Sequence, residues 1–202
     1  MGKSTLFNCL SNAKAQSANF PFCTIEPNIG VVNVPDSRLE KLESLVNPER
    51  VMPATVEIVD IAGLVKGASK GEGLGNQLLA NIRETDALSQ VLRCVDNDTI
   101  VHVDASIDPI RDKETIDMEL QLKDLETVEK KIEKVKKASR TGDKAAIKEL
   151  DLLTRLKDNL EAAVSVRAIE FTEKEREEFI TPLQLLTDKP VLYVCNVDEA
   201  SA

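Results

Sequence analysis

Residues 55–76 read TVEIVDIAGLVKGASKGEGLGN, and this stretch decides the fold. Its first five residues, Thr55–Val59, form a short apolar run rich in β-branched side chains, which predicts a β-strand. The strand ends at Asp60-Ile-Ala-Gly63, and five of the chain's eight glycines fall between Gly63 and Gly75. This is the form of a Walker B and switch II motif, in which Asp60 holds Mg²⁺ through a water and the Gly63 N–H senses a γ-phosphate. A strand that ends in a polar turn is the plain alternative.

The chain opens with Gly2-Lys3-Ser4-Thr5, which has the form of the end of a phosphate-binding loop. A helix predicted over residues 4–11 would point its first N–H groups, and the positive end of its dipole, at phosphate oxygens. Lys3 would reach the β- and γ-phosphates, and the Ser4 hydroxyl would bind Mg²⁺. An ordinary helix start is the alternative if the tripeptide is taken alone. Together with Asp60 it predicts that Gly2, Lys3, Ser4 and Thr5 bind a nucleotide.

Thr24 lies between the first predicted helix and the next predicted strand, where a switch I segment belongs. A threonine in that place would close over Mg²⁺ and the γ-phosphate. We therefore add Thr24 to Ser4 and Asp60 as a predicted metal ligand. A plain loop threonine is the alternative interpretation.

The base-binding end of the site is predicted at Asn196-Val-Asp-Glu199, which follows the apolar strand Val191–Cys195. In guanine-specific GTPases this place reads Asn-Lys-x-Asp, and the final aspartate accepts hydrogen bonds from the guanine N1 and N2 groups. Here Val197 stands in place of the lysine, and the longer Glu199 in place of the aspartate. Asn196 can still bond a purine edge. The motif thus weakens selection for guanine and favours adenine.

The order of elements predicts an α/β fold of the P-loop NTPase type, a mostly parallel sheet flanked by helices. Apolar runs predict strands at 28–34, 55–59, 88–95 and 191–195, and helices are predicted at 4–11, 36–45 and 74–84. Residues 1–111 and 181–202 are assigned to the nucleotide-binding domain of G type. Residues 112–180 are assigned to an insertion.

The insertion has the periodicity of two long helices. Apolar residues recur three and four apart at Met118, Leu122, Leu125, Val128, Ile132 and Val135, and again at Ile147, Leu150, Leu153, Leu156, Leu160 and Ala163. The turn sequence 139–143 separates the two runs. This predicts an antiparallel α-helical hairpin with a narrow coiled-coil seam.

The predicted hairpin tip is locally basic. Between residues 130 and 140 it carries Lys130, Lys131, Lys134, Lys136, Lys137 and Arg140, against the single acid Glu133. Such a patch could contact RNA phosphates. A solvated helix face with i,i+4 ion pairs explains the same residues.

Composition limits the class of protein. A net charge of −9 excludes a uniformly basic nucleic-acid-binding surface. The four cysteines lie far apart without CxxC spacing, which argues against a zinc site or a disulfide framework. No apolar run approaches the length of a membrane span, and the first residues do not resemble a signal peptide. These features predict a cytoplasmic protein with no membrane partner.

Three stretches together resemble the Obg-like ATPases of the YchF type, which are translation-factor-class P-loop NTPases. They are Asn19-Phe-Pro-Phe-Cys-Thr-Ile-Glu-Pro-Asn28, the sequence from Asp60 to Asn76, and Asp108-Pro-Ile-Arg-Asp112. The resemblance spans essentially all 202 residues. It implies hydrolysis of ATP in preference to GTP, dependence on Mg²⁺, and a regulatory switch that associates with the ribosome or its large subunit.

The family places a hydrophobic residue, here Leu64, where Ras-like enzymes keep the glutamine that orients water. An alkyl side chain cannot hydrogen-bond water, so hydrolysis needs another group. His102, the chain's only imidazole, is the candidate for positioning water or transferring a proton. We therefore predict Lys3, Gly63 and His102 as the catalytic set. A surface-loop histidine is the alternative.

The family's phosphate loop opens Gly-x-x-Asn-x-Gly-Lys-Ser after a hydrophobic strand, whereas this chain starts inside the loop. We therefore expect a truncated nucleotide-binding domain whose 202 residues alone bind nucleotide poorly. The loop asparagine is a potential potassium ligand, so K⁺ is a cofactor expected only of a complete protein. A GTPase of the Obg type and a non-catalytic binding module are the two alternative functions.

Overall fold

The computed structural model describes residues 2–11, 27–64, 67–69, 74–95 and 107–199. The chain divides into two compact units, Met1–Ala62 and Gly63–Ala202, and each is described by itself. This division does not coincide with the predicted domain boundaries at residues 112 and 180. Those boundaries mark out the helical hairpin insertion and stay a prediction.

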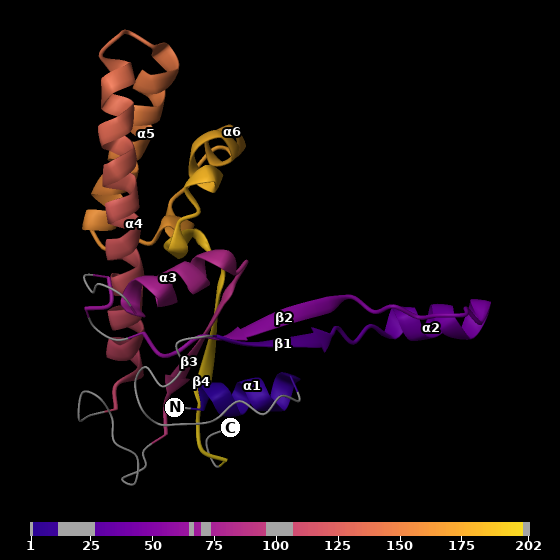
Figure 1. Cartoon of the computed structure of the whole chain (residues 1–202). Coiled ribbons are helices and arrows are strands. Elements are labelled where there is room, and N and C mark those ends of the chain that lie inside the picture. Colours follow the sequence, from indigo (N-terminus) through magenta and orange to yellow (C-terminus); the bar gives the residue numbers. More distant parts are fainter. Residues whose placement is uncertain (1, 12–26, 65–66, 70–73, 96–106, 200–202) are drawn as a thin grey trace. The chain divides into compact units, whose positions relative to one another are not determined.

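The first unit is built on a two-stranded ribbon. Its elements are α1 (Lys3–Ser11), β1 (Asn28–Asn33), α2 (Ser37–Val46) and β2 (Thr55–Asp60). β1 and β2 pair antiparallel, with Asn28 opposite Asp60 and Asn33 opposite Thr55. Figure 1 shows α2 at the far end of this ribbon. The chain can reverse there because α2 ends at Asn47, whose φ of 44° is in the left-handed region.

Helix α1 packs closely on β1 because position 30 is a glycine. A Cβ built on Gly30 would lie 2.4 Å from the Ser11 Cβ and 3.3 Å from the Phe7 ring. Phe7 is buried at this contact. The missing side chain therefore lets α1 lie against the ribbon that carries Asp60.

The second unit contains a parallel strand pair. Its first elements are α3 (Leu74–Glu84) and β3 (Leu88–Arg93), and β4 (Val191–Asn196) comes near the end of the chain. β3 and β4 run parallel, with Leu88 opposite Val191 and Arg93 opposite Asn196. The predicted strands and helices are thus present, with bounds within two residues of those predicted. Of the two described strand pairs, one is parallel and one antiparallel, whereas the sequence predicted mostly parallel pairing.

A hairpin of two long helices occupies this region. It consists of α4 (Pro109–Ser139) and α5 (Lys144–Glu161), which lie side by side in Figure 1. Asp108 and Asp143 cap the two helices, accepting hydrogen bonds from the backbone N–H groups of Arg111 and Ala145 at 3.0 and 2.9 Å. The side chains of the predicted seam that are buried are Val128, Ile132, Val135, Leu153, Leu156 and Leu160. The supercoil that the spacing predicts stays a prediction.

At the base of the hairpin the buried face of α4 differs from the predicted one. Met118 and Leu122 were expected in the seam, but they are 55% and 36% exposed. The polar Asp117 and Asp124 are buried on this helix instead. The reason is a second partner for α4: the chain that returns from α5 packs against this face. Its short helices are η1 (Val166–Ala168), α6 (Glu173–Glu175), η2 (Arg176–Ile180), η3 (Thr181–Leu183) and η4 (Leu186–Asp188).

Asp124 joins α4 to η4. One of its carboxylate oxygens accepts a hydrogen bond from the Leu186 N–H at 2.7 Å. The other accepts from the N–H and the hydroxyl of Thr187, also at 2.7 Å. Burial raises the pKa of Asp124, and these hydrogen bonds oppose that shift.

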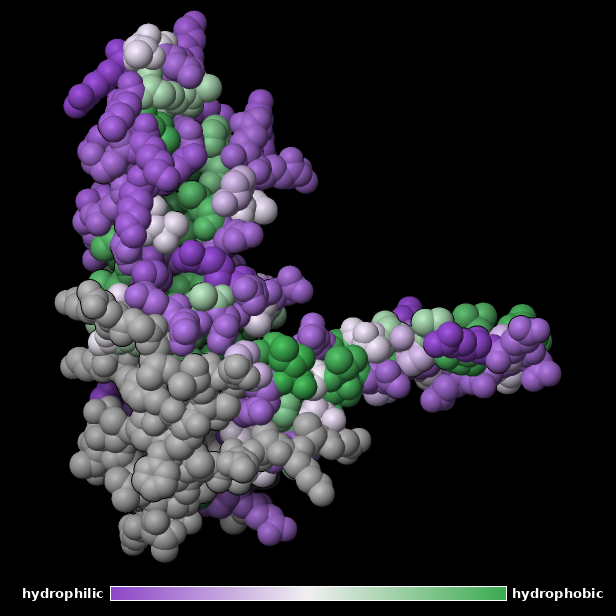
Figure 2. All heavy atoms as spheres, in the orientation of Figure 1, coloured by the Kyte–Doolittle hydropathy of each residue, from purple (hydrophilic) through white to green (hydrophobic). Residues whose placement is uncertain are grey.

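Three of the basic residues at this end of the hairpin take part in ion pairs. Lys131 lies 2.9 Å from Glu149, Lys136 lies 3.1 Å from Glu133, and Lys130 pairs with Glu126. Figure 2 shows hydrophilic side chains over the outer faces of this region. The pairs are those expected of a solvated helix face, so contact with RNA phosphates stays a hypothesis. In the described parts of the chain, no helix has both the length and the apolarity needed to cross a bilayer.

Candidate functional site

The candidate phosphate and metal site is built around Asp60, at the carboxyl end of β2. Its side chain is only 4% exposed. A buried carboxylate is costly unless it is paired. Both of its oxygens have partners here, and these partners come from the start of α1.

Lys3 and Ser4 each contact one oxygen of that carboxylate. The Lys3 ammonium donates to Oδ1. The Ser4 hydroxyl donates to Oδ2 at 2.9 Å. The structure therefore brings together three of the predicted site residues, which lie 56 and 57 positions apart in the sequence. The Ser4 hydroxyl and the Asp60 carboxylate are oxygen donors of the kind that Mg²⁺ binds, so the residues fit that ion.

The start of α1 has the backbone of an anion-binding turn. Gly2 has a φ of 90°, which favours glycine, and its carbonyl accepts the Leu6 N–H at 2.8 Å as the helix begins. The first N–H groups of a helix have no partner within it, and its dipole is positive there. Thr5, in this first turn, is exposed. This is a geometry in which backbone groups can receive phosphate.

The other predicted residues near the phosphates are only partly described. Gly63 is exposed, and a Cβ built on it would meet nothing within 4 Å, so its backbone is open to a ligand. Leu64 is half-buried. Thr24 and His102 lie outside the described residues, and their roles stay predictions.

The predicted base-binding residues follow β4 in the second unit. The Asn196 carbonyl accepts the Cys94 N–H at 2.9 Å, which fixes the end of the strand beside β3. Val197 is 36% exposed, and Glu199 lies in an exposed turn. The side chains of Val197 and Glu199 are therefore accessible to a nucleotide base. Convergence of these residues with Lys3, Ser4 and Asp60 on one nucleotide stays a prediction.

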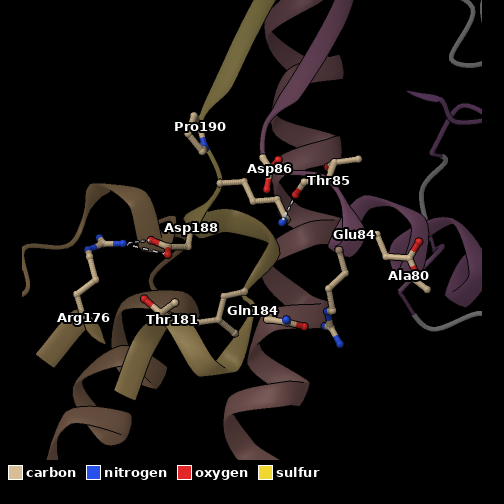
Figure 3. A pocket seen from close by; sticks show the side chains of 12 residues that line it. Ala80, Glu84, Thr85, Asp86, Arg176, Thr181, Gln184, Asp188 and Pro190 are labelled. Carbon is tan, nitrogen blue, oxygen red and sulfur yellow. Dashed lines mark hydrogen bonds and ion pairs between the residues drawn. The ribbon is translucent and has the colours of Figure 1, made fainter. Parts of the chain in front are cut away.

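The second unit also contains a hollow of about 710 Å³, shown in Figure 3. Asp86 and Pro190, which precede β3 and β4, line it, so it lies at the amino ends of these strands. Asn196 lies at the opposite, carboxyl end. Two of the charged groups in the hollow are paired: Arg176 donates to both oxygens of Asp188 at 2.9 and 3.0 Å. The hollow is therefore distinct from the predicted base-binding end.

Sequence reasoning missed two buried acids on α4 that hold other segments in place. Asp124 binds η4, and Glu119 binds the backbone of Gly67 and Ser69. One signal was available: polar residues recur at 117, 121 and 124, spaced like one face of a helix. That spacing indicates a polar helix face, but not its partner.

Comparison of the sequence with known proteins identifies related proteins and a matching family model. A family model described as "50S ribosome-binding GTPase" matches residues 1–135. A Bacillus subtilis protein named "Ribosome-binding ATPase YchF" is 53% identical over 199 residues, which is 98% of this chain and 54% of the relative. A Haemophilus ducreyi protein of the same name is 54% identical over 201 residues, covering 100% of this chain and 55% of the relative.

A solved structure gives the same result for the fold. The Schizosaccharomyces pombe "YchF GTPase" is 39% identical and superposes with a TM-score of 0.78, covering 99% of this chain and 55% of the solved one. The chain thus spans about half the length of the relatives it matches. These matches confirm the P-loop NTPase fold and the family resemblance that the sequence motifs indicated. The chain belongs to the 50S ribosome-binding GTPase family, and within P-loop NTPases it is a member of the YchF group.

Proposed function

We propose that this chain provides the nucleotide-binding part of a Mg²⁺-dependent ATPase that acts as a ribosome-associated switch. The observation that carries the proposal is the convergence of Lys3 and Ser4 on the buried carboxylate of Asp60. A cation, a hydroxyl and a carboxylate in this arrangement are the parts with which P-loop enzymes hold a triphosphate and its metal. Family membership supports the same activity.

Each residue then has a role at the phosphates. The N–H groups at the start of α1, from Gly2 to Thr5, receive phosphate oxygens, and Lys3 neutralises charge on the β- and γ-phosphates. Ser4 and Asp60 would hold Mg²⁺, and Thr24 is the third predicted ligand. Bound Mg²⁺ would supply electrostatic stabilisation of the phosphate charge. The open backbone of Gly63 lets its N–H sense the γ-phosphate.

The relatives' printed names support a ribosomal partner. Two are called ribosome-binding ATPases, and the matching family model is described by 50S ribosome binding. A ribosomal partner in turn means that the protein works in the cytoplasm. The fission yeast relative is titled a GTPase, which keeps an Obg-type GTPase as the alternative. A non-catalytic module that binds through its hairpin is the second alternative.

Nucleotide choice tests the proposal. We define the extended chain as this sequence joined to the segments of the Bacillus subtilis relative that lie outside the match. With Mg²⁺ it is expected to hydrolyse ATP and to bind ATP at least about tenfold more tightly than GTP, because Glu199 misplaces the acceptor that selects guanine. Competition of ATP and GTP for a fluorescent nucleotide measures the preference, and phosphate release measures turnover.

Two matched variants test whether Glu199 is responsible for the preference for ATP over GTP. Glu199→Asp restores the shorter carboxylate and should narrow the gap between ATP and GTP. Glu170→Asp makes the same change at another exposed glutamate and should leave it unaltered. Preference for GTP in the unaltered extended chain would favour the Obg-type alternative. Nucleotide binding without turnover would favour the binding module.

A second test concerns the group that activates water. Since Leu64 cannot hydrogen-bond water, we propose His102 for that role. His102→Ala is expected to lower the ATP turnover of the extended chain by about 100-fold, with nucleotide affinity changed less than twofold. Single-turnover phosphate release and equilibrium titration measure the two quantities. An unchanged rate would leave His102 as an ordinary surface-loop histidine.

Replacing KCl by NaCl in the same assay tests the predicted K⁺ dependence.

A further inference from the structure

Glu119 is a buried acid that the nucleotide site does not use directly. It lies on α4 and is 4% exposed. Its Oε1 accepts the Gly67 N–H at 2.6 Å, and its Oε2 accepts the Ser69 N–H at 2.8 Å. Hydrogen bonds from two N–H groups to a charged, desolvated carboxylate are strong, and losing the acceptor leaves both donors unpaired. This contact therefore fixes a backbone segment to α4.

The segment held by Glu119 comes directly after the switch II motif. Gly67 is four residues past Gly63, and its φ of 88° suits glycine. Two N–H groups directed at one anion form a nest of the kind that binds phosphate elsewhere, and here a side chain of the same protein fills it. The anchor thus holds the part of the chain that must respond when Gly63 senses a γ-phosphate.

A second contact holds the same turn from the other side. Ala68 is 5% exposed, and a Cβ built on Gly75, near the start of α3, would lie 2.3 Å from its carbonyl oxygen. The turn is therefore fixed between α3 and α4, and it can shift only if the Glu119 hydrogen bonds change. Position 119 lies 20 residues before the end of α4, or about 30 Å along a continuous helix, so α4 can carry such a shift to the hairpin tip.

We propose that Glu119 is a positioning residue for hydrolysis, which ties the segment after Gly63 to the hairpin helix α4. The inference rests on the proposed function, since it assumes that Asp60–Gly63 is the nucleotide-sensing motif. Glu119 does not touch the nucleotide. It acts by holding the Gly67–Ser69 backbone, which follows the sensing motif, against α4, so that the hairpin follows the nucleotide state.

The test is Glu119→Gln in the extended chain. The amide keeps the shape of the side chain but offers one acceptor oxygen, so its NH₂ group opposes one of the two N–H donors. We expect kcat for ATP to fall about tenfold, with KM changed less than twofold, because the segment matters to the transition state rather than to binding. We also expect hydrogen exchange in the peptide spanning residues 63–76 to speed up several-fold. Glu114→Gln removes the same charge at an exposed position of α4 and should change neither.

The outcomes distinguish a positioning role of Glu119 in hydrolysis from a purely structural contact and from a role in nucleotide binding. Faster exchange with an unchanged kcat would show a purely structural contact and overturn the positioning role, as would unchanged exchange. A rise in KM alone would also overturn it. Should Glu119→Gln fail to fold, Glu119→Asp keeps both oxygens on a shorter side chain and is expected to lower kcat about threefold; a wild-type kcat in that variant would overturn the proposal. If the unaltered extended chain hydrolyses no ATP, the proposed function fails first and the positioning role falls with it, while the exchange measurement still reports whether Glu119 holds the segment.

Discussion

Replacing Lys3 by alanine is expected to lower the ATP turnover of the extended chain by about 100- to 1,000-fold. The Lys3 ammonium is held beside Asp60, where a triphosphate would bring its β- and γ-phosphates. Charge on those oxygens must be stabilised in the transition state, and a preorganised cation does this without reorganisation. Because Lys3→Ala also removes a donor from the buried Asp60 carboxylate, the thermal unfolding of the variant is measured beside its turnover. Mg²⁺-dependent phosphate release measures the effect.

Lys41→Ala is the control for this substitution. It removes the same charge from an exposed position of α2 in the same unit, and turnover should stay within twofold of the unaltered chain. A loss of less than about threefold for Lys3→Ala would mean that the contact with Asp60 is structural only. The catalytic role predicted for Lys3 would then be wrong, even though Lys3 lies beside Asp60.

Replacing Asp124 by alanine is expected to lower the free energy of unfolding by about 3 kcal/mol. Three donors, the N–H groups of Leu186 and Thr187 and the Thr187 hydroxyl, would lose their acceptor in a place where water is excluded. Asp124 and Thr187 are both fully buried. Chemical denaturation followed by far-UV circular dichroism measures the loss.

The control for Asp124 is Asp151→Ala, at an exposed position of α5, which should change the free energy of unfolding by less than about 0.5 kcal/mol. A loss below about 1 kcal/mol for Asp124→Ala would show that water or a rearranged η4 satisfies the donors.

The dependence of the free energy of unfolding on pH gives a further check. Because burial raises the pKa of Asp124 above its usual 3.8, the folded state binds the proton more tightly than the unfolded state does. The proton-linked part of its contribution to stability is therefore fully present below pH 3.8 and is lost as the pH rises through the folded-state pKa. The three hydrogen bonds to the carboxylate account for the loss expected on substitution at neutral pH.

The sequence alone identified the four described strands, the five longest helices and the motif residues. Each of these is a local pattern: an apolar run that ends at Asp60, a Gly-Lys-Ser tripeptide at a helix start, and apolar residues three and four apart along α4 and α5. The structure places β2, α1 and the hairpin where these patterns predicted them. Because the motifs follow in the order of a P-loop NTPase, the sequence also predicted that Lys3 and Ser4 would lie near Asp60.

The tertiary structure decided which face of α4 is buried and how the first two strands pair. Met118 and Leu122 fit the apolar spacing of the hairpin, yet they are exposed, because the chain returning from α5 binds the neighbouring face of α4 through Asp124. The antiparallel pairing of β1 and β2 likewise depends on where the chain turns back around α2.

Glu119 shows the same division between sequence and structure most sharply. Two of its partners, the N–H groups of Gly67 and Ser69, are 52 and 50 residues away in the sequence. Periodicity describes how a segment places its own side chains, and it can mark a helix face as polar or apolar. A hydrogen bond to a distant backbone N–H leaves no such local pattern, because every residue except proline carries that donor. The sequence therefore determined the site's ingredients, and only the packing of α4 against the turn determined what Glu119 holds.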